Sequence, residues 1–397
     1  MSKHVSHDLK LQPSRDEWAR QDFVSALRAR VLNDMANTMK QHYEVAIAPK
    51  MEKPAETGQD VHKAMKPDLY FKFYSGLRVN AQEMVWDAVR PTLERDADRL
   101  QGVARELGEK AVGGSISLDP EFVVPSNVES IDVHLMPGSY HSESGLDDLR
   151  AGALYDNGLD VFSFGLMGQN LDDIGQSIST WVSQKFPNFK PERILDMGCS
   201  IGHNTQPWAQ TYPDAHVTGM DVSAPCLRYA HARSQSQGVP VHYKQGNAAH
   251  TDLPSGSFDL VFSSMFLHEL PKKDIRGVFA EAFRLLKPGG LLLHYELPPN
   301  SATSPYDGFY LDWDSFYNYE PYYKGFRDMD PLGLCTEAGF SKDQFFQTVV
   351  PSINWYGRDA VIESLAVDKA EAGDDNTGRF ADGVKWFSFG AWKDTAA

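Results

Sequence analysis

The sequence contains few cysteines and no long apolar run. Its three cysteines, Cys199, Cys226 and Cys335, have no CxxC spacing and are odd in number, which disfavours a disulfide framework and a zinc site, so we expect no metal. The amino terminus, "MSKHVSHDLKLQPSRDEW", lacks an apolar stretch of signal-peptide or membrane-spanning length. These absences predict a cytoplasmic protein without a membrane span.

Basic residues are also scarce. The 397 residues include 38 Lys and Arg against 54 Asp and Glu, which gives a net charge of −16, and no long basic run occurs. Because this balance repels the phosphate backbone, we expect no nucleic-acid partner. A chain of this length with 42% hydrophobic residues can bury a sizeable core and form two or three domains.

The first part of the chain is predicted to be mainly helical. Phe23, Leu27 and Val31 follow four-residue steps, and Gly and Pro are sparse apart from "APKMEKPAETG". Residues 1–112 are therefore expected to form a helical domain that binds substrate or dimerises. Residues 113–168 have weak periodicity and much Gly, Pro and Ser, which predicts a long connection that wraps over the site.

Residues 169–397 alternate between short apolar runs and longer helical patterns. The runs are "RILDMG", "HVTGMDVS", "VHYKQGN", "FDLVFSS" and "GGLLLHYEL", with segments such as "APCLRYAHARSQSQ" and "IRGVFAEAFRLL" between them. This alternation predicts an α/β domain, with a doubly wound, mostly parallel sheet and helices on its faces.

Polar residues and glycines gather at the ends of the predicted strands, where ligands bind in open parallel sheets. "ILDMGCSIG" (194–202) ends the first strand, and Gly198 and Gly202 would let its backbone approach a ligand. The turn is not GxGxxG and no P-loop lysine follows it, so a pyrophosphate is not expected. Asp221, which lies 25 residues after Asp196 (221 − 196), ends the second strand, where an acid accepts hydrogen bonds from ribose hydroxyls. A helix cap is the alternative role for Asp221.

Two further strand ends belong to the same crevice, and with them the motifs carry a family resemblance. Asn247 and Ala248 follow the third strand, and the fourth ends at Ser263–Ser264 before "MFLHEL". In order and spacing, "ILDMGCSIG", "GMDVS", "QGNAAHTDLPSGSFDLVFSSMFLHELP" and "LLKPGGLLLHYE" resemble the motifs of class I S-adenosylmethionine-dependent methyltransferases, and are most similar to the ubiquinone/menaquinone-biosynthesis type. The resemblance covers roughly residues 170–300 and continues weakly through "LCTEAGFSKDQFFQTVV" and "KWFSFGAWK".

The resemblance implies a Rossmann-like sheet of seven strands that closes with an antiparallel hairpin, S-adenosylmethionine as cofactor, and a small-molecule acceptor. The first motif of the family, commonly DxGCGxG, approaches the amino-acid part of the cofactor and maps onto Asp196, Gly198, Cys199 and Gly202. Ser200 replaces the middle glycine, so we expect an ordinary rather than a left-handed backbone there.

The later motifs imply further cofactor contacts. Asp221 matches the ribose-binding acid, and Val222 matches the apolar neighbour that borders the adenine. Asn247, followed by Ala248, stands where many relatives carry an Asp that faces the adenine amino group, and an amide oxygen can accept the same hydrogen bond. Ser263 matches the strand end that lines the methyl-transfer pocket.

Transfer of a methyl group is an in-line displacement, so holding the acceptor in place is the main task. A hydroxyl or amine acceptor also needs a general base. His268, which begins the helix after the fourth strand, is the first candidate, and Glu269, His294 and Glu296 are alternatives. We expect O-methylation of a hydroxyl or carboxylate, with N- or S-methylation as the nearest alternative.

The substrate residues are expected outside the cofactor motifs. Segment 300–335 is rich in aromatic residues and is predicted to form a lid, and the helical region contains a second aromatic cluster. Apolar walls with a few polar groups suit a small organic acceptor, and Arg78 and Arg327 could each hold an anionic one. Packing between domains or within a homodimer is the alternative for both clusters. The candidate substrate residues are Tyr70, Tyr74, Arg78, Tyr310, Trp313 and Arg327.

Two other functions are weighed against an enzyme of this family. A noncatalytic binding or assembly protein could keep the fold, and calorimetry with S-adenosylmethionine would separate it from an enzyme. A nicotinamide-dependent oxidoreductase is disfavoured because GxGxxG is absent and the chain closes with an apparent antiparallel hairpin.

Overall fold

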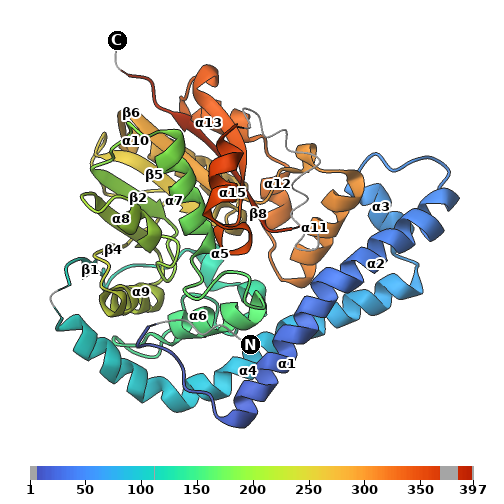
Figure 1. Ribbon diagram of the computed structural model, residues 1–397, viewed down its shortest axis with the longest axis horizontal. Helices are drawn as coiled ribbons and strands as arrows, with labels where there is room; N and C mark the ends of the chain where they lie inside the picture. The colour runs from blue at the N-terminus through green and yellow to red at the C-terminus, as the bar shows by residue number, and fades with distance from the viewer. Residues whose placement is uncertain (1–6, 111, 367–382, 396–397) are drawn as a thin grey trace.

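The centre of the protein is one eight-stranded sheet (Figure 1). The computed structural model describes residues 7–110, 112–366 and 383–395. The strand order is β1-β4-β3-β2-β5-β6-β8-β7; β8 runs antiparallel to β6 and β7, and all other pairs are parallel. The strands are β1 (Ser115–Ser117), β2 (Arg193–Met197), β3 (His216–Asp221), β4 (His242–Gln245), β5 (Phe258–Ser264), β6 (Leu286–Glu296), β7 (Phe345–Pro351) and β8 (Lys385–Trp392).

The parallel sheet with its closing antiparallel pair confirms the predicted fold class, with one strand added. Seven strands were expected, and the eighth, β1, lies in the predicted connection and pairs in parallel with β4, Ser115 opposite His242. A strand of three residues is too short to show the alternation that marks strands in a sequence.

Helices cover both faces of the sheet (Figure 1). Along β2 the side chains alternate between the faces, so that Ile194 packs in the same cluster as Trp208, whereas Leu195 packs in the cluster of Val278. One face carries α7 (Asp173–Lys185), α8 (Gln206–Thr211), α9 (Ala224–Gln237), α14 (Ile353–Tyr356) and α15 (Arg358–Glu363), and the other carries α10 (Lys272–Leu285) and α13 (Pro331–Ala338).

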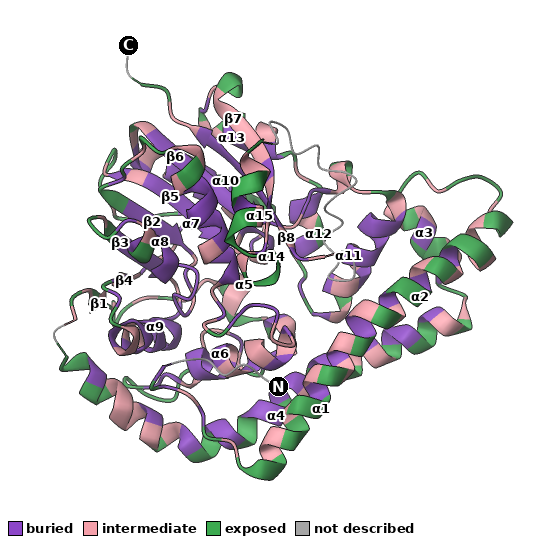
Figure 2. Ribbon diagram, in the orientation of Figure 1, coloured by how far each residue is buried: buried purple, intermediate pink, exposed green. Residues whose placement is uncertain are grey.

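The amino-terminal region is built on two long helices that lie side by side (Figure 1). The first begins with a capping box between Ser14 and Glu17, and the second contains Pro91. Figure 2 shows that their exposed residues lie on the outer sides. Within the described ranges, no helix is long and apolar enough to cross a membrane. The helices of this region are α1 (Arg15–Ala29), which continues through π-helical turns and α2 (Met35–His42), then α3 (Gly58–Met65) and α4 (Leu69–Gly108).

The connecting segment differs from the prediction because it contains α6 (Arg150–Phe162), in addition to β1 and the short α5 (Ser126–Glu129). At Gly158, α6 approaches α4 so closely that a Cβ would lie 2.3 Å from the Trp86 ring. A glycine on the packed face therefore takes the place of an apolar residue in the helical pattern of α6.

The aromatic segment forms α11 (Pro305–Tyr317) and α12 (Tyr323–Arg327). Trp313 stacks on Tyr74 with 4.8 Å between ring centroids, and Phe309 lies 5.6 Å from Phe71. Most rings of α11 thus pack against the helical region, as the packing alternative proposes.

Candidate active site

A cavity of about 290 Å³ lies at the carboxyl ends of β2, β3 and β5. Asp196 and Asp221 line it from the sheet, Tyr140 from the connecting segment, and Arg28 and Tyr310 from α1 and α11. One cavity thus receives side chains from all three parts of the chain, at the sheet edge where open parallel sheets bind ligands.

The glycine turn after β2 is held against β3. The N–H groups of Gly198 and Cys199 donate to the carbonyl oxygen of Met220 at 2.8 and 3.0 Å. Gly198 has φ +79°, and a Cβ there would lie 2.2 Å from the Phe266 ring. Only glycine fits this position, because the left-handed backbone and the close ring each exclude a side chain.

The expectation of an ordinary backbone at Ser200 is wrong. Ser200 has φ +47°, and its N–H donates to Asp221 Oδ2 at 2.8 Å. The carboxylate of Asp221 thus accepts a hydrogen bond from a serine in the left-handed conformation. Ser200 therefore keeps the shape of the turn without the glycine.

Asp221 joins the glycine turn to the start of α9. Its Oδ1 accepts the Ser223 N–H at 2.9 Å, and burial raises the pKa of its carboxyl. The helix cap itself is Ser223, whose Oγ accepts the Cys226 N–H at 3.1 Å. Each oxygen of Asp221 accepts one backbone bond and retains a lone pair, so a ligand diol can still be bound from the cavity.

Asp196 presents an unpaired oxygen at the cavity wall. Thr205 Oγ1 donates to its Oδ2 at 2.5 Å, whereas Oδ1 is buried without a hydrogen-bond partner among the described residues. Burial raises the pKa of this carboxyl to about 7. An unpaired buried carboxylate oxygen fits a cationic donor such as the ammonium group of a bound amino acid.

The remaining predicted cofactor residues divide into two groups. Cys199 and Val222 line the cavity, as Gly198 does, and Ser264 lines it at the end of β5. Ser263 does not, because its Oγ lies 2.7 Å from His294 Nδ1 in the buried interior. The others outside the lining are Gly202, Asn247 and Ala248.

His268 and Glu269 line the cavity on a single turn of 3-10 helix after β5 (Leu267–Glu269). His268 Nδ1 lies 2.6 Å from Glu296 Oε2, and Glu296 Oε1 accepts the N–H groups of Phe266 and Leu267 at 2.8 and 2.6 Å. Burial alone would lower the pKa of His268, but Glu296 and Glu269 outweigh it and raise the pKa to about 9. His268 is therefore protonated at neutral pH.

His294, the remaining candidate base, does not line the cavity. Its ring is fully buried beside Ser263, and burial lowers its pKa to about 3. It belongs to the core and is withdrawn as a base.

His134 is a cavity residue that the sequence did not reveal. Its Nε2 lies 3.3 Å from Glu269 Oε1 and its Nδ1 lies 2.9 Å from Glu320 Oε1. Against the effect of burial, these carboxylates raise its pKa to about 10. Its φ of +59° is unusual for a non-glycine residue, and its carbonyl oxygen accepts bonds from Gln82 and Trp86, both at 2.7 Å. Strain of this kind is typical of functional positions.

Of the six candidate substrate residues, Arg78 and Tyr310 line the cavity. The other four pack elsewhere. Tyr74 donates to Val31 O at 2.8 Å, Trp313 donates to Ser75 Oγ at 2.8 Å, and Tyr70 contacts the His42 ring edge-on. The guanidinium of Arg327 binds Pro298 O at 2.9 Å and Asp312 Oδ1 at 3.2 Å.

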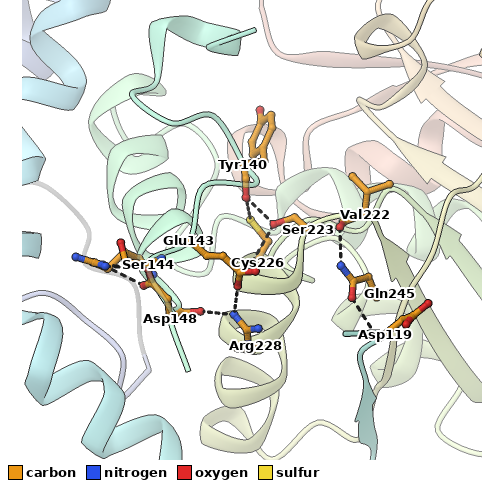
Figure 3. Close-up of polar contacts among 11 residues, drawn as sticks. Asp119, Tyr140, Glu143, Ser144, Asp148, Val222, Ser223, Cys226, Arg228 and Gln245 are labelled. Atoms are coloured by element: carbon orange, nitrogen blue, oxygen red, sulfur yellow. Dashed lines mark hydrogen bonds and ion pairs between the residues drawn. The ribbon is translucent and has the colours of Figure 1, made fainter. Parts of the chain in front are cut away.

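Hydrogen bonds and an ion pair join the connecting segment to the residues that follow β3, to α9 and to the end of β4 (Figure 3). Ser223 Oγ donates to Tyr140 O at 2.5 Å, and Arg228 donates to Glu143 Oε2 at 2.5 Å. Gln245 bridges the two parts, because it accepts the Asp119 N–H at 3.1 Å and donates to Val222 O at 3.0 Å. These bonds hold the segment that carries Tyr140, which also lines the cavity.

Comparisons with known proteins agree with this architecture. Residues 194–290 match a family model described as a methyltransferase domain. The erythromycin 3''-O-methyltransferase of Saccharopolyspora erythraea is 30% identical over 140 residues, which are 34% of this chain and 44% of that protein. The trans-aconitate 2-methyltransferase of Deinococcus radiodurans is 36% identical over 115 residues, 28% and 41% of the two chains.

A solved structure of Haemonchus contortus phosphoethanolamine N-methyltransferase 2 in complex with S-adenosyl-L-methionine is 18% identical, with a TM-score of 0.41, over 64% of this chain and 61% of that chain. The chain spans about half the length of the curated relatives it matches. The match at 194–290 runs from β2 into the first residues of β6 and includes the ends of β2, β3 and β5, where the cavity lies. This match identifies residues 194–290 as a methyltransferase domain.

Proposed function

We propose that this protein transfers the methyl group of S-adenosylmethionine to a small-molecule acceptor, with oxygen as the preferred acceptor atom. The observation that carries the proposal is the shared cavity. The glycine turn and the acids Asp196 and Asp221 line one part of it, and His268, Glu269 and aromatic residues line another.

The first part of the cavity fits the cofactor. The unpaired Oδ1 of Asp196 would bind its ammonium group, and the free lone pairs of Asp221 would accept the ribose hydroxyls. Gly198 would let the backbone approach it. S-adenosylmethionine supplies an activated methyl group, so the remaining task of the protein is to hold the acceptor in line.

Proton transfer is assigned to His268. Glu296 is a positioning residue, since backbone N–H groups and His268 occupy both of its oxygens. Because the pKa of His268 is about 9, only a small fraction of the neutral imidazole is present at pH 7. A hydroxyl acceptor therefore reacts faster as the pH rises toward 9, whereas an acceptor that arrives as a carboxylate shows no such rise.

Calorimetry and a product search test the proposal together. We expect the protein to bind S-adenosylmethionine and S-adenosylhomocysteine, and to produce a labelled, methylated compound from an extract of the producing organism with a labelled donor. His268→Gln should keep cofactor binding and lose most of the transfer. Binding without any labelled product would favour the noncatalytic alternative, and absence of binding would refute both.

A further inference from the structure

Two buried arginines face the cavity with unused hydrogen-bond donors. Arg28 and Arg78 are each 1% exposed and both line the cavity. The Nη2 group of each has no hydrogen-bond partner among the described residues. A buried guanidinium nitrogen without an acceptor is rare in folded proteins, and the position of these two at a cavity wall indicates that a ligand supplies the missing acceptor.

The other side-chain nitrogens of the two arginines already donate hydrogen bonds to protein atoms, so the positions of the free Nη2 groups are fixed. Both Nη1 groups donate to Gln82 Oε1, at 2.6 Å from Arg28 and 3.2 Å from Arg78. Arg28 Nε donates to Phe162 O at 2.9 Å, and Arg78 Nε donates to Asp314 Oδ1 at 2.5 Å. Among the described residues, the two guanidinium groups thus share the neutral oxygen of Gln82, and Asp314, bonded to Arg78, is the one carboxylate that accepts from either of them.

In the part of the chain that the structure describes, this arrangement leaves one of the two positive charges without a carboxylate partner, and the Arg28 guanidinium lies over the Phe162 ring, 4.1 Å from its centroid. Burial and the neighbouring Arg78 hold the pKa of Arg28 well below its usual range, as expected for like charges in a poorly solvated place. A bound anion would relieve both effects.

The second group of charges in the cavity has the opposite sign. Around the 3-10 turn, the carboxylates of Glu269, Glu296 and Glu320 outnumber the imidazolium groups of His134 and His268. An anion is therefore disfavoured there and favoured at the arginines.

Resting on the proposed methyl transfer, we infer that the acceptor carries a carboxylate, and that Arg28 and Arg78 bind it through their free Nη2 groups. A carboxylate has two oxygens for two donors and one charge for the one unpaired charge. Arg28 and Arg78 come from α1 and α4, whereas the glycine turn follows β2 (Figure 1). The carboxylate thus binds at the helical end of the cavity, and another atom of the acceptor faces the strand ends.

Binding of matched probes to the protein saturated with S-adenosylhomocysteine tests the inference. The pairs are benzoate and benzamide, 4-hydroxybenzoate and 4-hydroxybenzamide, and cinnamate and cinnamamide, measured by ligand-observed NMR titration. We expect each carboxylate to bind about tenfold more tightly than its amide, since charged hydrogen bonds are the stronger ones. Equal binding within the pairs, or no carboxylate binding, would overturn the inference. Tighter binding of phenyl phosphate than of benzoate would overturn the carboxylate assignment.

Three variants assign the preference to the arginine pair. Arg28→Gln and Arg78→Gln should reduce the preference for the carboxylate to about onefold. Asp314→Asn removes the compensating charge and should raise the preference several-fold, which keeps the test valid where an arginine variant fails to fold. Arg327→Gln is the control, because the guanidinium of Arg327 is bound outside the cavity. A preference that Asp314→Asn leaves unchanged contradicts the inference.

The cofactor gives a separate readout in the same samples. Unchanged affinity for S-adenosylhomocysteine together with no carboxylate preference would refute the arginine site alone. Loss of cofactor binding in the wild-type protein would refute the proposed function itself.

Discussion

Replacing Glu296 with glutamine tests the charge of His268. The carboxylate of Glu296 accepts two backbone N–H groups through Oε1 and faces His268 Nδ1 through Oε2 at 2.6 Å. A glutamine keeps the carbonyl acceptor for the backbone and turns an NH₂ group toward the imidazole. The variant should therefore fold, with His268 neutral and its Nδ1 accepting a hydrogen bond.

The size of the expected effect on stability follows from the pKa of His268, which rises from 6.5 to about 9 on folding. The difference of about 2.5 units corresponds to about 3 kcal/mol of folding free energy. Because the folded pKa is the higher one, this stabilisation is complete below about pH 6.5 and is lost as the pH rises through about 9. His268 is 6% exposed, so water screens the pair little.

Urea unfolding between pH 6 and 9.5 measures the effect. Between these limits the wild-type protein should lose about 3 kcal/mol more than Glu296→Gln. His134 contributes equally to the pH dependence of stability in both proteins, so its contribution cancels in the difference between them. Glu281→Gln is the matched control, because Arg284 holds the pKa of Glu281 at about 2 and its contribution is constant above pH 6. A wild-type His268 that titrates at or below 6.5 by NMR, or equal pH dependence in the two proteins, refutes the reasoning.

Three further changes test the cofactor part of the cavity. Asp221→Ala should weaken S-adenosylhomocysteine binding about 100-fold or more in calorimetry, since two charged hydrogen bonds are lost; unchanged affinity contradicts the assignment. Gly198→Ala should lower the melting temperature and the cofactor affinity because its Cβ meets the Phe266 ring, whereas Gly145→Ala, which meets no atom within 4 Å, should change neither. Ser200→Gly should raise the free energy of unfolding by up to about 1 kcal/mol in urea, and a loss of stability would contradict the strain at its φ of +47°.

The sheet and the position of two acids, Asp196 and Asp221, at the cavity could be predicted because their signals are local. Apart from β1, each strand of the parallel sheet lies in one of the short runs recognised in the sequence, and Asp196 and Asp221 stand at the ends of two of these runs. Strand ends of a parallel sheet meet at one edge whatever the rest of the chain does. The position of such residues in space therefore follows from their position in the sequence.

The opposite wall of the cavity could not be predicted, because it forms through long-range packing. Arg28, Arg78 and His134 lie on α1, α4 and the connecting segment, and Gln82 bonds to all three. Apart from the four-residue step from Arg78 to Gln82 within α4, no spacing in the sequence relates these residues. Two buried arginines that share one glutamine are visible only after the helices have packed.

Aromatic composition gave the weakest guide to the site. Tyr310 lines the cavity, whereas Trp313, one helical turn away, stacks on Tyr74 in the core. The two rings are neighbours on α11, with 5.4 Å between their centroids, and the composition of the segment does not indicate which of them reaches the cavity. Rings that fill a core and rings that line a pocket are chemically the same.

In the proposed reaction, the charges of the cavity place the carboxylate of the acceptor and the sulfonium of the methyl donor at different ends of the cavity. The arginine pair has one positive charge in excess, and the group around Glu269 has one negative charge in excess next to the strand ends. Charges in so buried a space are weakly screened, so each end favours a ligand group of opposite sign. A carboxylate is drawn to the arginines and a sulfonium cation to the glutamates. For a hydroxyl of the acceptor held between these two ends, the remaining requirement is removal of its proton. We therefore expect the charge of His268 to control the rate of transfer more than the binding of either ligand.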